Sequence, residues 1–373
     1  MGLFIIKFIL TNILFSLVIG FVLVRINSSN SSINIFNWFD RSGEKVSNLE
    51  LMLYALGLGP IFTVLILYYL LLVFHGLPNS FYLASVFLVY LALLFWGRKS
   101  VPLLGRDLKK KFGSALKSGK TKRWGHIIYF TFLLVLLVVF LYLYLGNMLQ
   151  VPIADHDTLV YGNIGKMYYM EKAVKYTDNM YNSIDGFFFI GSPKPSFSLL
   201  LTWEMIMNRG FAGGNDLSFD MYFRSISVYY GLLILMVVFY WLYKKNKYLA
   251  LLGIVVLFSG LKFFQVFVSY HLDSYRLFFL ILSWVFLAYS LKNKEPLAFF
   301  LLGVFSGFTA FTHLIGLLVA LVNIFAYFLF QEARFRERLL KTLALSVVIL
   351  CFGGIHYVLE AIWGARFGFL TYF

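Results

Sequence analysis

"LAFFLLGVFSGFTAFTHLIGLLVALVNIFAYFLF" occupies residues 297–330, and nearly all of its 34 residues are apolar. A single helix of that length would measure about 51 Å, whereas a bilayer's hydrocarbon core is only about 30 Å thick. Glycine, threonine and histidine interrupt its middle, at Gly303, Gly307, Thr309, Thr312 and His313. The stretch therefore predicts two short membrane helices that meet near His313 rather than one long span.

The whole composition agrees with a membrane protein. The chain is 61% hydrophobic and only 13% charged, with a mean hydropathy of +0.81. The ten-residue segments of alternating polarity that mark a transmembrane β-barrel are absent from the sequence. Apolar runs long enough for a spanning helix recur instead. We predict an all-α polytopic membrane protein of about ten transmembrane helices, at roughly 3–24, 51–73, 81–97, 126–146, 221–243, 248–268, 276–291, 297–311, 313–330 and 342–360. The first lacks a small-residue cleavage site, so we expect a retained helix.

Four basic connections set the topology, at 98–125, 244–247, 292–294 and 334–341. Positively charged loops favour the cytoplasmic side, and all four reach it only if 297–330 crosses twice. The segment 147–220 then lies outside and holds eight of the 17 acidic residues. Because three predicted spans precede the cytoplasmic loop 98–125, the amino terminus is expected to lie outside. Because the net charge of +15 is concentrated in these connections, it indicates contact with anionic lipid headgroups and no nucleic-acid partner.

The predicted spans divide the chain into three parts. Residues 1–97 form an N-terminal three-helix membrane region, and 98–125 form a basic cytoplasmic loop. Residues 126–373 form a seven-helix module whose large outer loop is 147–220. No internal repeat indicates inverted transporter halves. The single cysteine, Cys351, excludes an internal disulfide and a Cys-based zinc site, and we expect it to be a small buried residue.

Two carboxylates follow the first span of this module. Asp155 and Asp157 lie about nine residues beyond it, and in an extended segment side chains two positions apart point the same way. They would then reach one ligand from a loop at the membrane surface. Capping of the helix that follows is the alternative, since Asp is a good N-cap residue. His156, between them, is expected to be a bystander.

Other ionisable residues fall at the same predicted face. Lys194 stands between two prolines on a stiff turn that suits an anion such as a phosphate, or is simply a solvated turn residue. Arg224 opens the next span, where it would grip a lipid phosphate or snorkel. Asp273 and His313 also lie there, although a histidine of this kind can equally have a packing role. Ionisable groups at membrane depth are costly, so their convergence predicts a functional site.

This ordered set of motifs resembles the GT-C-type membrane glycosyltransferases, in particular bacterial relatives of the protein O-mannosyltransferases and of the lipid A aminoarabinose transferase. Asp157 and Tyr161 match the family's Asp-Glu-x-x-Tyr pattern, with Thr158 in place of the second acid. Lys194-Pro195-Ser196 is similar to its Lys-Pro-Pro, and His313 stands where a lysine is often found. Arg224 and Asp273 match an arginine and an aspartate at corresponding helix ends. The similarity covers about residues 126–330.

The resemblance implies an inverting transfer of a sugar from a polyprenyl-phosphate-linked donor to an acceptor hydroxyl. Asp157 would be the general base, with Asp155 second, and Lys194, Arg224, His313 and Tyr161 would bind substrate or phosphate. Asp155 and Asp273 would bridge a divalent metal, Mg or Mn. The site would lie at the outer face of a bacterial cytoplasmic membrane. Relatives usually continue beyond the seventh module helix, so we expect a partner membrane protein to complete that part. The alternative is a non-enzymatic flippase, transporter or scaffold for lipid-linked glycans.

Overall fold

The structure is a computed structural model. It describes residues 6–7, 9–28, 46–107, 109, 125, 127–129, 131–139, 142, 156–174, 195–212, 216–260, 273–293 and 296–362. Every regular element in these residues is a helix. In chain order they are η1 (Ile9–Leu14), α2 (Phe15–Ser28), α3 (Asn48–Ala55), α4 (Leu58–Val73), α5 (Asn79–Gly97), η3 (Arg98–Ser100), α8 (His156–Glu171), α10 (Pro195–Ala212), α11 (Asp216–Lys245), α12 (Lys247–Ser259), α14 (Asp273–Asn293), α15 (Pro296–Thr312), α16 (Leu314–Phe330), α17 (Phe335–Ile349), η4 (Leu350–Gly354) and α18 (Ile355–Ile362).

Several of these helices are long and apolar enough to cross a membrane. In the described residues there are five, or six if the bent pair α3 and α4 is one span. Shorter apolar helices match two further predicted ranges, at Pro296–Thr312 and Leu314–Phe330, and cover part of two others, at Ile127–Val139 and Lys247–Leu257. The fold is therefore that of an all-helical, multi-pass membrane protein. The count of ten spans and the seven-helix module stay predictions.

The stretch 297–330 forms two helices, as its length and its glycines predicted. His313 separates α15 from α16 with an extended backbone (φ −166°, ψ 159°), and its Nδ1 accepts the N–H of Ile315 at 3.1 Å. The two helices approach each other closely at this hairpin, so a Cβ at Gly316 would collide with the Thr309 carbonyl. The side chain of His313 thus caps the second helix in the place usually taken by Ser, Thr, Asp or Asn.

The range 51–73, predicted as one span, is instead broken into α3 and α4, which are bent by 56°. The carbonyl of Leu56 at the break accepts hydrogen bonds from Ser16 Oγ (2.7 Å) and the Tyr229 hydroxyl (2.5 Å). The next carbonyl, Gly57, accepts from the Tyr230 hydroxyl at 2.8 Å. These donors replace the lost helical bonds, which is the condition for a broken helix inside a bundle.

Polar contacts bring together the ends of α5, α11 and α14, which precede three of the four basic connections, at one end of the bundle. Asn48, beside the first turn of α3, donates to Asp107 beyond α5, and Ser47 lies 3.3 Å from the Tyr240 hydroxyl near the end of α11. Lys244 at the end of α11 also reaches Tyr289 near the end of α14. We call this the basic end.

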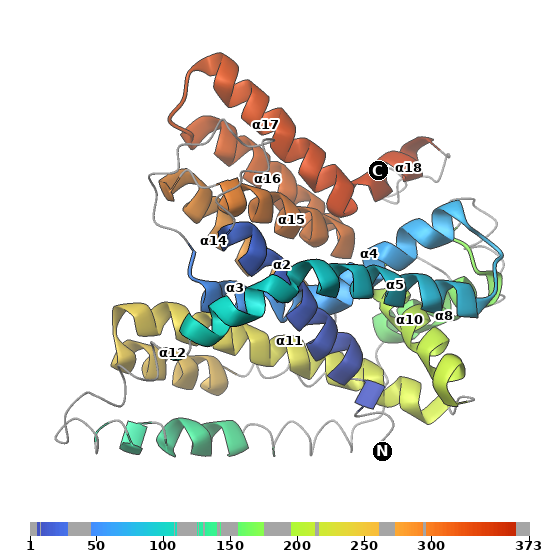
Figure 1. Cartoon of the computed structure of the whole chain (residues 1–373), viewed down its shortest axis with the longest axis horizontal. Helices are drawn as coiled ribbons and strands as arrows, with labels where there is room; N and C mark the ends of the chain where they lie inside the picture. The colour runs from blue at the N-terminus through green and yellow to red at the C-terminus, as the bar shows by residue number, and fades with distance from the viewer. Residues whose placement is uncertain are drawn as a thin grey trace.

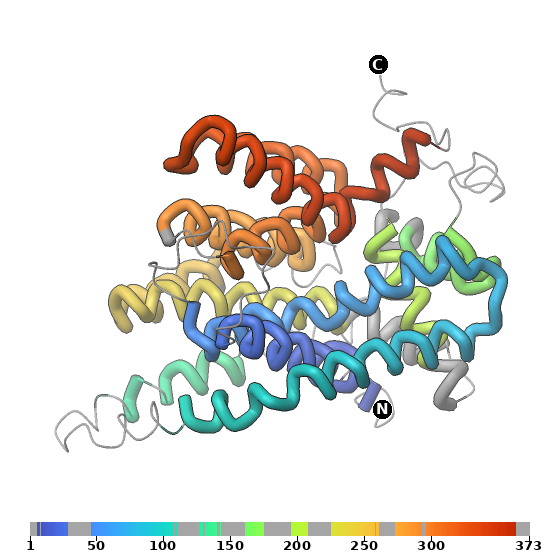
Figure 2. The backbone as a smooth tube through the Cα atoms, turned by 45° about the horizontal axis from the view of Figure 1, so that its top comes forward, coloured from blue at the N-terminus to red at the C-terminus, as the bar shows by residue number. Residues whose placement is uncertain are grey.

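The opposite end holds α8 and α10 beside the turn between α4 and α5 (Figures 1 and 2). There Gly76 N–H donates to the Lys172 carbonyl at 2.9 Å.

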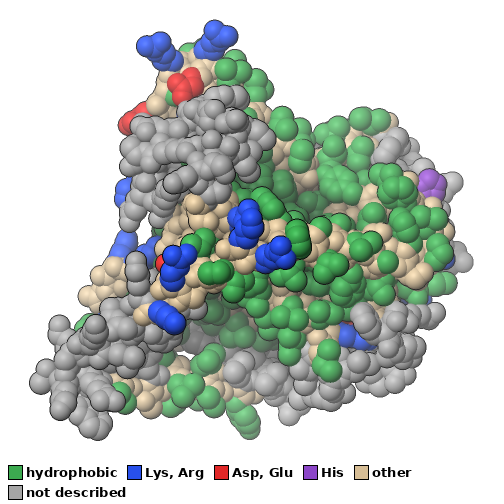
Figure 3. Space-filling model, viewed as in Figure 1, with side chains coloured by type: hydrophobic (Ala, Val, Ile, Leu, Met, Phe, Trp, Pro, Cys, Tyr) green, Lys and Arg blue, Asp and Glu red, His purple; other side chains and the backbone are tan. Residues whose placement is uncertain are grey.

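The described N-terminal helices share one core with the rest of the chain. Tyr229 of α11 bonds the Asn12 carbonyl, and Tyr69 of α4 bonds the Cys351 carbonyl. Hydrophobic side chains cover much of the molecular surface that Figure 3 shows, and Lys and Arg gather mainly on the left half of that view. Cys351 is exposed, so the expectation that it is buried was wrong. A thiol is nearly apolar and is tolerated on a face that contacts lipid.

Candidate functional site

Helix α8 places the acidic motif at the end of the bundle opposite the basic end. It begins at His156, so Asp157 lies in a first helical turn and not in the extended segment that we expected. An aspartate there is stabilised by the positive end of the helix dipole. Tyr161, Ile164 and Tyr168 form the buried stripe of this helix. Asp157 stands one turn before Tyr161, at a position that continues the same stripe.

Tyr161 connects this helix to the first turn of α14. Its hydroxyl accepts a hydrogen bond from Arg276 Nη2 at 3.3 Å, although 115 positions separate the two residues. Arg276 Nη1 pairs with Asp273 Oδ1, also at 3.3 Å. The guanidinium is 22% exposed and the carboxylate 49% exposed. A chain of one tyrosine, one arginine and one aspartate thus joins the two segments that the motifs singled out.

Aromatic rings hold these helix ends together. Phe197, in the first turn of α10, packs edge-on against Tyr161 (5.8 Å between centroids) and lies 6.1 Å from Tyr275. Tyr275 packs in turn against Tyr230 of α11 at 5.0 Å. Arg224 lies six residues before Tyr230 on the same helix. The beginnings of α8, α10 and α14 therefore meet beside the segment of α11 that follows Arg224.

His313 reaches this region through α18. The Tyr357 hydroxyl lies 2.8 Å from the Ala310 carbonyl and 3.1 Å from the His313 carbonyl, with Tyr161 nearby. Because Nδ1 of His313 accepts a hydrogen bond, the ring proton sits on Nε2 and the ring is neutral. In this arrangement His313 offers an anion an N–H donor rather than a positive charge.

The predicted site residues divide into three groups. The structure brings Tyr161 and Asp273 together and places His313 near them. For Asp157 and Arg224 it describes the helix position alone, and Asp155 and Lys194 lie outside the described residues. No three metal-ligating side chains meet within the described residues, and Asp273 is already paired with Arg276. The Mg or Mn site stays an expectation, and we derive no step from it.

Sequence reasoning gave no role to three groups. Arg276 was detectable, because it lies three positions after Asp273 and so shares its helix face. His356 and Glu360 of α18, spaced four apart, approach to 3.7 Å and are both buried.

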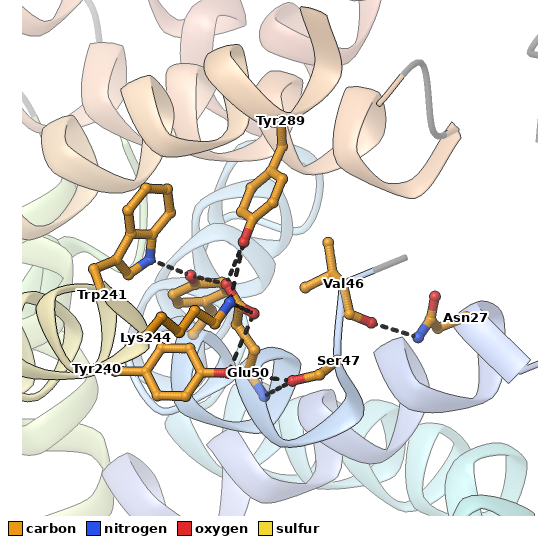
Figure 4. Close-up of polar contacts among 9 residues, drawn as sticks. Asn27, Val46, Ser47, Glu50, Tyr240, Trp241, Lys244 and Tyr289 are labelled. Atoms are coloured by element: carbon orange, nitrogen blue, oxygen red, sulfur yellow. Dashed lines mark hydrogen bonds and ion pairs between the residues drawn. The ribbon is translucent and has the colours of Figure 1, made fainter. Parts of the chain in front are cut away.

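The third group surrounds Glu50, which is buried at the basic end and receives bonds from α11 and α14 (Figure 4). Its sequence signal was the spacing Ser47-x-x-Glu50 of a helix-capping box.

Comparisons with protein-family models, with curated proteins and with solved structures find no match to this chain.

Proposed function

We propose that this protein is a glycosyltransferase that moves a sugar from a polyprenyl-phosphate-linked donor to an acceptor hydroxyl, with inversion, at the outer face of a bacterial cytoplasmic membrane. The proposal rests on the ordered motifs and on one observation. Tyr161 of the acidic-motif helix and Asp273 of α14 are joined by Arg276, across more than a hundred positions.

The electrostatics at this end of the bundle suit a phosphate. Helices α8, α10 and α14 begin here, and helix N-termini favour anions. Arg276 adds a guanidinium whose Nε is buried without a hydrogen-bond partner in the described residues. Its two bonds to Tyr161 and Asp273 are long, at 3.3 Å each, so a phosphate oxygen would compete well for it.

In the proposed reaction an acceptor oxygen attacks the anomeric carbon of the donor sugar. Its proton passes to the Asp157 carboxylate, with Asp155 as the second choice of base. The bond between the anomeric carbon and the phosphate oxygen breaks, and its electron pair leaves with the polyprenyl phosphate. Lys194, Arg224, Arg276 and the Nε2–H of His313 would stabilise the anion that departs.

The test measures binding and turnover separately on protein in lipid nanodiscs. Binding uses undecaprenyl phosphate, and turnover uses its release from a panel of undecaprenyl-phosphate hexoses and pentoses, with water as the acceptor of the sugar. Asp157→Asn should lower release by about 10²- to 10⁴-fold, the loss typical of a missing general base, and leave binding intact. Arg276→Gln and Lys194→Ala should weaken binding first, because a charge-assisted contact contributes about 1.5–3 kcal/mol.

Glu171→Gln, at the far end of α8, is the matched control and should change neither quantity. A fully active Asp157→Asn protein would show that this carboxylate is not the general base and has only a structural role in the first turn of α8. The role of base would then pass to Asp155.

A transporter or flippase is the second candidate, and the broken helix α3–α4 favours it. Discontinuous helices hold ions and substrates in many transporters. Here, however, the carbonyls of Leu56 and Gly57 already accept hydrogen bonds from hydroxyls of the chain. The donors are Ser16, Tyr229 and Tyr230, so these carbonyls are engaged within the protein. Transfer of intact donor between leaflets, without release of undecaprenyl phosphate, would establish this rival.

A further inference from the structure

The carboxylate of Glu50 lies at the centre of a saturated polar cluster at the basic end. Its side chain is 1% exposed. Oε1 accepts from the hydroxyls of Tyr54 (2.5 Å) and Tyr289 (2.8 Å). Oε2 accepts from Lys244 Nζ (2.5 Å) and the Tyr240 hydroxyl (3.3 Å). Figure 4 shows these groups pointing at the carboxylate from neighbouring helices.

The Glu50 cluster joins three helices that are distant in sequence. Glu50 and Tyr54 belong to α3, Tyr240 and Lys244 to α11, and Tyr289 to α14. Because the Glu50 carboxylate is buried while Lys244 is 43% exposed, removing Lys244 would leave a buried charge without its counter-charge, which is destabilising. The carboxylate therefore links the three helices at this end of the bundle.

The cluster is also a cation site with aromatic walls. Lys244 Nζ lies 4.7 Å from the ring centroid of Tyr240, and the Trp241 indole donates to the Tyr54 hydroxyl at 2.7 Å. The ring of Trp241 packs at 5.6 Å against Tyr289. A carboxylate among aromatic faces is the usual receptor for an ammonium group, and here the ammonium belongs to the chain itself.

Both partner helices run unbroken from the cluster to the candidate site. Helix α11 extends from Asp216 to Lys245 and carries Arg224, and α14 extends from Asp273 to Asn293 and carries Arg276. Rigid helices are among the elements that carry coupling between distant sites. The spacing that Glu50 imposes at the basic end therefore bears on the spacing of these groups at the opposite end.

We propose that the Glu50–Lys244 pair is a lock by which α3 fixes the separation of α11 and α14 and so positions Arg276 and Asp273. In this proposal Glu50 and Lys244 are positioning residues, and the N-terminal helices contribute to the geometry of the site. Only the lipid-binding readout below rests on the proposed function.

The first experiment tests the cation site by chemical rescue. Lys244→Ala should lower the Tm, and millimolar propylammonium chloride should recover part of the loss, whereas sodium chloride at equal ionic strength should not. The double variant Glu50→Gln/Lys244→Ala, which lacks the carboxylate, should show no recovery. Equal effects of the two salts on Lys244→Ala would overturn the assignment.

The second experiment tests action at a distance. Glu50→Gln should weaken undecaprenyl phosphate binding by about 5- to 150-fold, the range of typical coupling between sites, and speed amide exchange in the second turn of α14, where the N–H groups are hydrogen-bonded within the helix. Glu337→Gln is the control, because it removes a different pair, with Lys341 at 2.6 Å on α17. It should leave both readouts unchanged.

Each remaining outcome has a defined meaning. A folded Glu50→Gln protein with wild-type binding and wild-type exchange would refute the lock. If Glu50→Gln does not fold, Lys244→Ala takes its place in both measurements. If the wild-type protein binds no undecaprenyl phosphate, the proposed function fails and exchange in α14 alone decides on the lock.

Discussion

At the scale of single residues, Glu204 of α10 carries a buried carboxyl with no hydrogen-bond partner in the described residues. Burial raises its pKa to about 8, and the charge of Lys7 opposes this rise only in part. In the unfolded chain the carboxyl loses its proton near 4.5. Between these values the folded state binds the extra proton, so stability falls as the pH rises from about 5 to about 8 and is level above.

Glu204→Gln should remove this slope, because the amide keeps the shape of the neutral acid and does not titrate. The measurement is the Tm in detergent across pH 5–9 for both proteins. Glu332→Gln, on the exposed turn after α16, should keep the wild-type slope. Parallel curves for Glu204→Gln and wild type would show that Glu204 is ionised in the folded protein.

Residue types and their order were readable from the sequence, but their pairing was not. The motifs named Tyr161 and Asp273 separately. The bond that joins them passes through Arg276, which depends on how α8 packs against α14 and on no local pattern. The ion pair between buried Glu50 and exposed Lys244 was missed for the same reason, since its partners are 194 positions apart.

At the scale of the helices, the bend before α18 depends on Gly353. Its φ of +136° is open to glycine alone, and a Cβ there would meet the Phe311 side chain and lie 2.7 Å from the Gly307 carbonyl. Gly353→Ala should therefore cost at least about 1–3 kcal/mol, measured as a loss of Tm. The bend also places Tyr357 beside the His313 carbonyl, so binding of undecaprenyl phosphate should weaken with it.

Gly105→Ala is the control, because nothing lies within 4 Å of a Cβ at that helical position. It should be neutral or should stabilise by up to about 1 kcal/mol, as alanine does in an exposed helix. Equal Tm values for the two variants would mean that the bend after Ile349 does not contribute to stability.

Length and helix breakers determined which elements were predictable. The range 297–330 was too long for one span and had glycines and a histidine at its centre, so its division into α15 and α16 followed. The range 51–73 has the length of one span, and our prediction relied on that length. It did not use the helix-breaking residues Gly57, Gly59 and Pro60 inside the range. Its division needs the hydroxyls of Ser16, Tyr229 and Tyr230, which no local pattern announces.

At the scale of the whole molecule, the distribution of charge and the packing lead to the same arrangement. The basic connections that the positive-inside rule assigned to one side include 98–107 and 244–247, and described contacts bring these to one end. Tyr161, Arg276 and Asp273 lie at the other end. The sequence divided the chain after residue 97, yet the helices before it pack into the common core.

The sidedness of this arrangement can be tested by cysteine labelling. In a Cys351→Ala background, a cysteine in place of His313 should react with a membrane-impermeant maleimide added to intact cells. A cysteine in place of Lys245, which is exposed at the basic end, should react only after the membrane is made permeable. The physical reason is that Lys and Arg in short connections are retained on the cytoplasmic side. The reverse pattern would place the candidate site in the cytoplasm, where soluble nucleotide sugars are available and the argument for a lipid-linked donor no longer holds.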